Sequence, residues 1–151
     1  MSFVHVSFFD RFPEFNHNPR ASIRDEFDRL AETQGWTKKE TTKKRIECYN
    51  DEFESYFANL ELETQLERLQ HLCVELEIIP KDTVTQCKKA LSSVHVNIVH
   101  LMNARRTKTK VKKFSSNASL VRYIRKTKEF FPLEEAKCDV IKVLLRQIFY
   151  K

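Results

Sequence analysis

The chain has 151 residues, a formal net charge of +6, and a composition that is 41% hydrophobic and 32% charged. This length fits one domain with its own hydrophobic core, so the fold needs neither a metal ion nor disulfides. The single glycine excludes the Walker and dinucleotide classes of nucleotide-binding protein, whose loops need several glycines close to phosphate. It also argues against sandwiches and barrels, whose tight turns need positive φ angles.

The two halves of the chain carry charges of opposite sign. Residues 1–78 contain ten Lys or Arg and sixteen Asp or Glu, whereas residues 79–151 contain seventeen and five. The contrast is sharper locally: segment 81–128 has thirteen cations and one acid, and segment 47–77 has nine acids and one base. Such asymmetry predicts either partners of opposite polarity or electrostatic attraction between the two halves.

The first twenty residues are rich in phenylalanine and end in a turn-like stretch before Arg20. We interpret residues 1–20 as an extended segment that lays aromatic rings over grooves between helices; an aromatic surface for a partner is the alternative. Phe3, Val4 and Val6 are compatible with a short strand, but a lone strand forms no sheet. The start lacks the early positive charge and the long apolar run of a secretory signal.

Residues 21–151 are predicted to form a single all-α domain, a compact bundle of about six helices. The first three are marked by capping residues and by apolar residues at three- or four-residue spacing. The second is expected to run to about Phe57, with a buried face of aromatic residues and isoleucine. The defining residues are Ser22 and Gly35 for the first, Thr37, Glu40, Ile46, Tyr49 and Phe53 for the second, and Leu62, Leu66, Leu69, Leu72 and Leu76 for the third.

A central helix of some five turns is predicted at residues 83–104. Thr83 and Gln86 have the form of a capping box at its start. Its apolar residues repeat with the period of one helix face, and they are Val84, Cys87, Leu91, Val94, Ile98, Leu101 and Met102.

Two further helices complete the predicted bundle. The fifth follows the capping run Ser115-Ser116-Asn117 and stops before Pro132, and the sixth occupies the C-terminal residues. Their apolar faces are Leu120, Val121, Ile124 and Phe131 in the fifth, and Ala136, Val140, Ile141, Leu144, Leu145, Ile148 and Phe149 in the sixth. No internal repeat of fixed period is present, which argues against a solenoid.

Cysteines, histidines and paired acids were considered as chemical groups. The four cysteines Cys48, Cys73, Cys87 and Cys138 are widely separated, which is typical of buried free thiols in a reducing compartment. No zinc-type spacing is found, so neither a metal nor another cofactor is expected. The acidic pairs lie on polar helix faces and no catalytic residue is predicted. A small enzyme with a site assembled in space is kept as an alternative.

A basic loop is predicted at residues 105–114, where six cations fall within nine residues without an acid. Such a run can bind nucleic acid or an acidic protein, can act as a nuclear import signal, or can simply keep a loop solvated. Residues 105–113, the basic arm, contain no aromatic residue, which argues against nucleic-acid binding. Cations of the neighbouring helices extend the surface, and the predicted binding residues are Lys88, Lys89, Arg105, Arg106, Lys108, Lys110, Lys112, Lys113, Arg122, Arg125 and Lys126.

Three runs of sequence, QCKKALSSVHVNIVHLMNARR, EFDRLAETQGW and FP-x-x-x-AK, resemble a family of small uncharacterised all-helical proteins of fungi. The resemblance covers most of the chain. It implies a helical fold and carries no activity, ligand or site residue.

The sequence therefore predicts a non-catalytic helical interaction module, an adaptor or accessory subunit that works inside the cell, in the nucleus. We expect its helical surface to hold a protein partner and its basic surface to contact nucleic acid or an acidic protein. A protein that binds DNA or RNA directly is the alternative. No apolar run approaches the eighteen residues that span a bilayer, so no contact with a membrane is expected.

Overall fold

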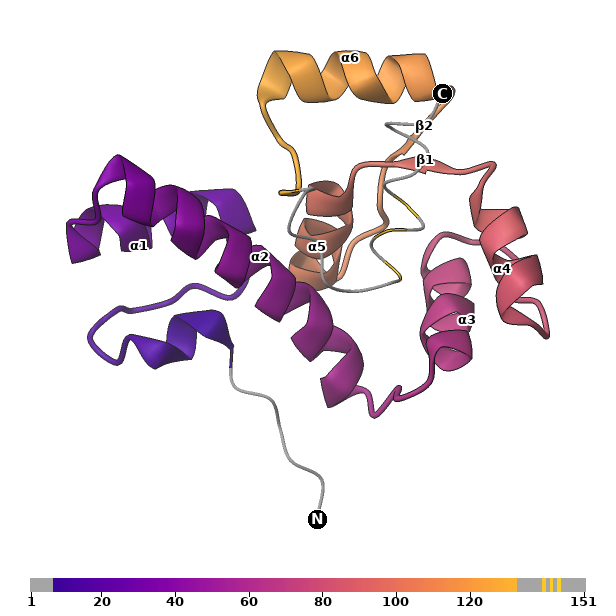
Figure 1. The fold of residues 1–151 in the computed structure, drawn as a ribbon, viewed down its shortest axis with the longest axis horizontal. Coiled ribbons are helices and arrows are strands. Elements are labelled where there is room, and N and C mark those ends of the chain that lie inside the picture. The colour runs from indigo at the N-terminus through magenta and orange to yellow at the C-terminus, as the bar shows by residue number, and fades with distance from the viewer. Residues whose placement is uncertain (1–6, 133–139, 141, 143, 145–151) are drawn as a thin grey trace.

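The computed structural model describes residues 7–132, 140, 142 and 144, and these form a mostly helical fold (Figure 1). The all-α class predicted from the sequence is confirmed. The described elements, in chain order, are the 3₁₀ helix η1 (Phe8–Arg11), α1 (Ile23–Gln34), α2 (Lys38–Asn59), α3 (Gln65–Glu75), α4 (Val84–Leu91), β1 (His95–Val96), α5 (Ile98–Thr107), β2 (Lys113–Phe114) and α6 (Asn117–Thr127).

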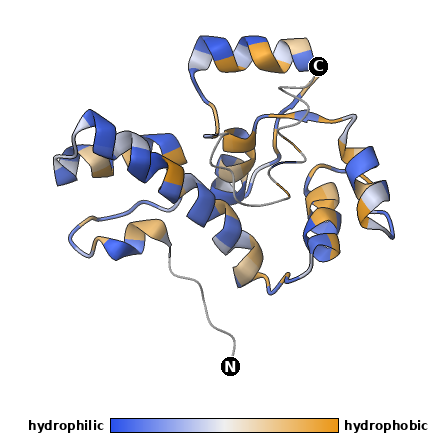
Figure 2. Ribbon diagram, viewed as in Figure 1, coloured by the Kyte–Doolittle hydropathy of each residue, from blue (hydrophilic) through white to orange (hydrophobic). Residues whose placement is uncertain are grey.

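The long helix α2 crosses the molecule diagonally, and the other elements are arranged around it (Figure 1). Helix α1 and η1 lie against its first part, α3 and α4 pack together beyond its end, and α6 lies above α5 and the ribbon β1–β2. Figure 2 shows apolar residues on α3, α5 and the end of α2, whereas α1 and the start of α2 are largely polar. No helix among the described residues is long and apolar enough to cross a membrane.

The first two helices begin and end where their capping residues indicate. The side chain of Ser22 accepts a hydrogen bond from the backbone of Asp25, and Gly35 ends α1 with a left-handed φ of 65°. Thr37 and Glu40 form both hydrogen bonds of a capping box at the start of α2. These predicted boundaries are confirmed, and α2 ends at Asn59, two residues later than expected.

The prediction of a single helix at residues 83–104 is wrong, because this part of the chain forms α4, β1 and α5. Ser92 closes α4, since its backbone N–H binds carbonyls of the last turn, and the side chain of Asn97 caps α5 by accepting from His100 N at 3.1 Å. Between them, two β-branched valines favour an extended backbone. Leu91 and Ile98 are nevertheless buried, so two short helices satisfy the apolar spacing as well as one long helix would.

The break allows a small antiparallel ribbon that the sequence did not predict. His95 pairs with Phe114 and Val96 with Lys113. The ribbon contacts α6, so it fixes the start of that helix against the chain leaving α4. Ser116 caps α6 as expected, but the helix ends at Lys128 and Phe131 is buried beyond it, outside the helix.

The N-terminal segment packs on the helices, although it is not extended throughout. Ser7 and Asp10 form a capping box for η1, whose Phe8 and Phe9 are 1% exposed. Phe15 is also buried. These three aromatic rings of the segment therefore belong to the core. The strand considered at Phe3, Val4 and Val6 lies outside the described residues.

Three of the four cysteines are buried free thiols, as predicted. Burial raises the pKa of Cys73 to about 11 and raises that of Cys48 well above its ordinary value. Cys138 lies outside the described residues. So does most of the predicted sixth helix, Ala136, Ile141, Leu145, Ile148 and Phe149 included; its Val140 and Leu144 are described, and both are buried in the core.

Among the described residues, four other than glycine adopt the left-handed backbone conformation. They lie just past the ends of α2, α3, α5 and α6, with φ angles of 58° to 62°, and they are Glu61, Glu77, Lys108 and Lys128. Because the chain has one glycine, charged residues take the place that glycine usually holds at helix ends.

Leu91 tests the corrected core. It is 0% exposed, so we expect Leu91→Ala to lower the free energy of unfolding by about 2 to 5 kcal/mol through lost apolar transfer and an unfilled cavity. Val74→Ala is the control, because Val74 is 60% exposed and its truncation should cost less than about 0.5 kcal/mol. Urea denaturation measures both, and equal effects would contradict the assigned helix faces.

Candidate functional site

The basic loop predicted at residues 105–114 is shorter than expected. Arg105 and Arg106 lie in the last turn of α5, where cations interact favourably with the negative end of the helix dipole. Lys113 and Phe114 belong to β2. The eleven predicted binding residues therefore divide into two arginines that are integrated into the fold and nine cations of its outer surface.

Arg105 forms an ion pair in the interior with Glu75 of α3. Its Nε and Nη2 donate to the two carboxylate oxygens, each at 2.8 Å. The side chains are 7% and 14% exposed, so both charges are largely removed from water. This two-point geometry is the arrangement in which arginine binds a carboxylate most strongly.

Three aromatic rings of α2 surround the same guanidinium. The Arg105 Cζ lies 3.7 Å from the ring centre of Tyr56, 4.8 Å from that of Phe53 and 5.0 Å from that of Phe57. Its buried Nη1 has no hydrogen-bond partner in the described part of the chain, and the ring faces provide weak electrostatic compensation. The cation thus joins α2, α3 and α5 at one point.

Arg106 binds the connection that precedes α1. Its Nε donates to the carbonyl of Ala21 at 2.7 Å, and its Nη2 donates to the carbonyl of Asn18 at 2.9 Å and contacts His17 Nε2 at 3.3 Å. The guanidinium also lies over the ring of Phe9. Burial lowers the pKa of Arg106 from its ordinary value. This arginine therefore ties the N-terminal segment to α5.

His17 stands between Arg106 and the buried carboxylate of Glu26, which is 3% exposed. Its Nδ1 lies 3.0 Å from Glu26 Oε1, so Nδ1 donates and Nε2 accepts from Arg106 in the neutral ring. Burial and the nearby Arg106 charge lower the pKa of His17. Burial alone would raise the pKa of Glu26, but the Asn18 N–H and the Arg29 guanidinium outweigh it and the pKa is lowered.

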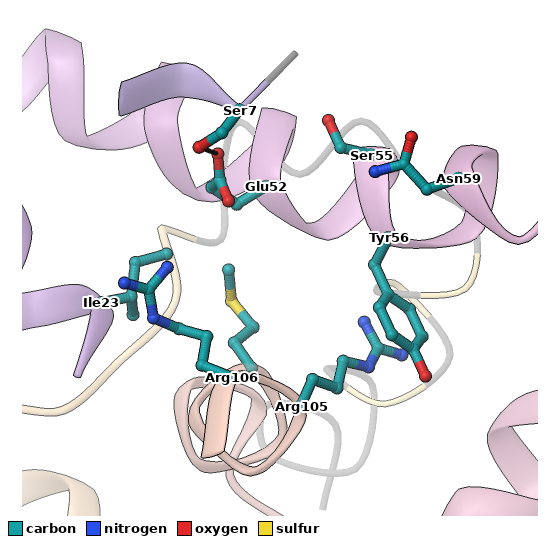
Figure 3. A pocket seen from close by; sticks show the side chains of 9 residues that line it. Ser7, Ile23, Glu52, Ser55, Tyr56, Asn59, Arg105 and Arg106 are labelled. Carbon is teal, nitrogen blue, oxygen red and sulfur yellow. Dashed lines mark hydrogen bonds between the residues drawn. The ribbon is translucent and has the colours of Figure 1, made fainter. Parts of the chain in front are cut away.

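A pocket of about 200 Å³ lies between α2 and α5, beside the two arginines (Figure 3). The side chains of Arg105 and Arg106 extend from α5 toward the face of α2 that carries Glu52, Ser55 and Asn59. The N-terminal segment and α1 close its sides. The full lining is Ser7, Ile23, Glu52, Ser55, Tyr56, Asn59, Met102, Arg105 and Arg106.

The exposed cations divide again according to the element that carries them. Lys88 and Lys89 lie on α4, which packs on α3 and is set apart from α6 (Figure 1). Lys110 forms an exposed ion pair with Glu77 at 3.1 Å, and Lys108 follows the end of α5. The remaining cations come from the chain around β2 and from α6, and we call them the basic surface: Lys112, Lys113, Arg122, Arg125 and Lys126.

Two aromatic rings lie beside Lys112 of the basic surface. Lys112 Nζ is 5.0 Å from the ring centre of Phe114 and 5.6 Å from that of Tyr123. The two rings are 5.2 Å apart. The sequence does not indicate this cluster, because Phe114 directly follows the basic arm and Tyr123 comes from α6, which contacts Phe114 only through the fold.

Tyr123 is held by a polar cluster that links α5 to the chain after α6. Its hydroxyl lies 2.7 Å from His100 Nε2 and donates to Glu129 Oε2 at 3.2 Å. Burial and the Glu129 charge raise the pKa of Tyr123. No group of three or more His, Cys, Asp or Glu side chains in the described part of the chain could hold a metal ion.

Comparison of the chain with protein-family models, curated proteins and solved structures gives no match. The functional assignment rests on the geometry alone.

The Arg105–Glu75 pair should contribute to folding. Arg105→Gln leaves a buried carboxylate without its cation, so we expect a loss of about 3 to 5 kcal/mol in the free energy of unfolding. Lys108→Gln is the control, because this exposed cation forms no ion pair with the described residues and should change stability by less than about 0.5 kcal/mol. The double variant Arg105→Met/Glu75→Leu should recover much of the loss, and a double variant as unstable as the single one would contradict a charge-based cause.

The pH dependence of stability should report on His17. Its pKa is lowered in the folded state from the ordinary 6.5, so the unfolded chain binds the proton first and stability falls as the pH drops below 6.5 toward the folded pKa. The contribution of Glu26 is lost in a more acidic range, below its ordinary pKa of 4.5. Urea denaturation from about pH 7.5 to about pH 2.5 measures both. His17→Gln should flatten the first decline and leave the second, and an unchanged profile would contradict the assignment.

Proposed function

We propose that this chain is a non-catalytic helical interaction module whose basic surface contacts nucleic acid. The observation that carries the proposal is the position of Lys112 over the rings of Phe114 and Tyr123, on a surface to which β2 and α6 add four further cations. Within the described residues, none of these five cations forms an ion pair. Their charge is therefore available to a partner.

The chemistry of nucleic acids matches both parts of this surface. Cations that neutralise phosphates release condensed counterions, which supplies most of the sequence-independent affinity. Aromatic side chains beside such cations stack on unpaired bases, which adds about 1 to 3 kcal/mol per base. Phe114 and Tyr123 are only partly buried, so they keep accessible surface next to Lys112.

An acidic protein shares the electrostatic part of this match and offers no base to stack on the rings. We therefore place it second. A protein partner can also bind elsewhere, since Val74 is 60% exposed and Ile79 is 78% exposed at the end of α3. These two apolar residues support the adaptor role within the same proposal.

The basic surface should determine nucleic-acid affinity. We expect Arg122→Gln/Arg125→Gln/Lys126→Gln to weaken binding to single-stranded RNA and to reduce the slope of log affinity against log salt by up to about two units. The matched control is Lys38→Gln/Lys39→Gln/Lys43→Gln, which removes the same charge from exposed positions at the start of α2. Fluorescence anisotropy at several salt concentrations measures both. Equal losses would show that net charge alone is responsible, and unchanged binding would exclude this surface.

The exposed cations of residues 108–113 fit a nuclear import signal, and we propose that the chain acts in the nucleus. The variant Lys108→Gln/Lys110→Gln/Lys112→Gln/Lys113→Gln changes only exposed lysines and keeps the two arginines of α5, so it should fold. It should no longer be imported into the nucleus. The test is the distribution of a fusion to a cargo too large to diffuse through nuclear pores. Lys38→Gln/Lys39→Gln/Lys43→Gln is again the control, and nuclear accumulation of both variants would contradict the signal.

A further inference from the structure

The pocket between α2 and α5 is too small for the partner proposed above and has a chemistry of its own. Its volume is about 200 Å³, whereas drug-sized ligands occupy roughly 300 to 1,000 Å³. Since a water molecule takes about 30 Å³ in the liquid, the pocket has room for about seven waters. Any organic ligand is therefore a small molecule of few heavy atoms.

Two opposite charges border this pocket without forming an ion pair with each other. Glu52 extends from α2 and Arg106 from α5, and Figure 3 shows both side chains at the same end of the cavity. The two side chains interact electrostatically: the negative charge of Glu52 stabilises the protonated form of Arg106. Opposite charges that face one pocket unpaired can each bind a complementary charge on a ligand.

Each of these two groups also has one polar atom that takes no part in its hydrogen bonds to the described residues. Glu52 Oε1 accepts from Ser7 Oγ at 2.8 Å and from the backbone of Phe8 at 2.6 Å, which leaves Oε2. Arg106 uses Nε and Nη2 for the backbone around α1, which leaves Nη1. The fold thus fixes both charged groups while leaving one acceptor and one donor.

We propose that this pocket binds a small zwitterion of the amino-acid class. The ligand carboxylate receives a charge-assisted hydrogen bond from Arg106, and its ammonium group donates to Glu52. Ser55 and Asn59, one helical turn apart on α2, line the cavity and offer further polar contacts to the ligand.

The same lining disfavours other charged ligands. A polyphosphate is larger than the pocket and is repelled by the Glu52 carboxylate. A simple cation is repelled by the two arginines. A monocarboxylate without an ammonium group gives Glu52 Oε2 no donor and places a second negative charge beside it. These differences make the charge pattern of the ligand the property to test.

Titration of the isotope-labelled full chain, followed by two-dimensional NMR, tests the proposal. The probes are glycine, β-alanine and 4-aminobutanoate, with acetate and ethylamine as ligands that carry only one of the two charges. We expect saturable shifts confined to signals of Ser7, Ile23, α2 and α5, in the millimolar range because so small a ligand offers few contacts. The best zwitterion should bind roughly tenfold more tightly than acetate or ethylamine.

A pair of charge-removing variants on α2 separates the pocket from general electrostatics. Glu52→Gln can still accept from Ser7 and Phe8, so it should fold, lose roughly tenfold in zwitterion affinity and leave acetate binding unchanged or stronger. Glu54→Gln removes the same charge from a residue that pairs with Arg68 outside the pocket, and it should leave affinity unchanged.

The proposal is overturned if no zwitterion gives saturable shifts, if acetate binds as tightly as the best zwitterion, or if the two variants behave alike. None of these outcomes affects the nucleic-acid proposal, because the pocket and the basic surface share no residue.

Discussion

The burial of the Arg105 charge is the constraint on which much of this fold depends. A guanidinium removed from water is stable only if its charge and its N–H groups are compensated nearby. Glu75 supplies the carboxylate from α3, and the rings of Phe53, Tyr56 and Phe57 supply the surrounding surface from α2. The relative positions of α2, α3 and α5 are therefore fixed by one side chain in addition to apolar packing.

The opposite charges of the two halves of the chain are partly satisfied inside the molecule. Arg105 pairs with Glu75 and Lys110 with Glu77, and in each pair the cation comes from the basic half and the acid from the acidic half. The type of cation follows its environment. Arg105 and Arg106 occupy the two positions of α5 that contact aromatic rings or backbone carbonyls inside the fold, where a planar group with several donors is useful. Lysine occupies the exposed positions after α5, where a hydrated point charge is sufficient.

The sequence predicted what depends on local chemistry. The boundaries of α1 and α2 followed from Ser22, Gly35 and the capping box at Thr37, because these signals act within one helical turn. The apolar periodicity of residues 83–104 predicted which side chains are buried, but it could not distinguish one helix from two. Asn97 decided the matter: asparagine favours N-caps but also occurs within helices, and only its hydrogen bond with His100 N shows that it caps α5.

The candidate site was less predictable for a different reason. A run of cations looks the same whether it is exposed or buried, and the partners that bury Arg105 and Arg106 lie 30 and about 85 residues away. The pocket combines four segments of the chain, so no local spacing announces it. Likewise, Phe114 and Tyr123 become neighbours only after β2 has paired with β1.

Because residues other than glycine hold the left-handed positions at four helix ends, this chain is less stable than the same backbone would be with glycine there. A residue with a Cβ in this conformation costs roughly 1 to 2 kcal/mol, and glycine, which avoids this, loses about 0.5 to 1 kcal/mol through its greater freedom when unfolded. Glu61, Glu77, Lys108 and Lys128 each hold such a position. Together these four positions lower the stability by a sizeable part of the roughly 5 to 15 kcal/mol that typically separates folded from unfolded domains. Lys108 and Lys128 place a cation beside the negative end of a helix dipole, which offsets part of this loss of stability. They also place positive charge at two defined points of the surface.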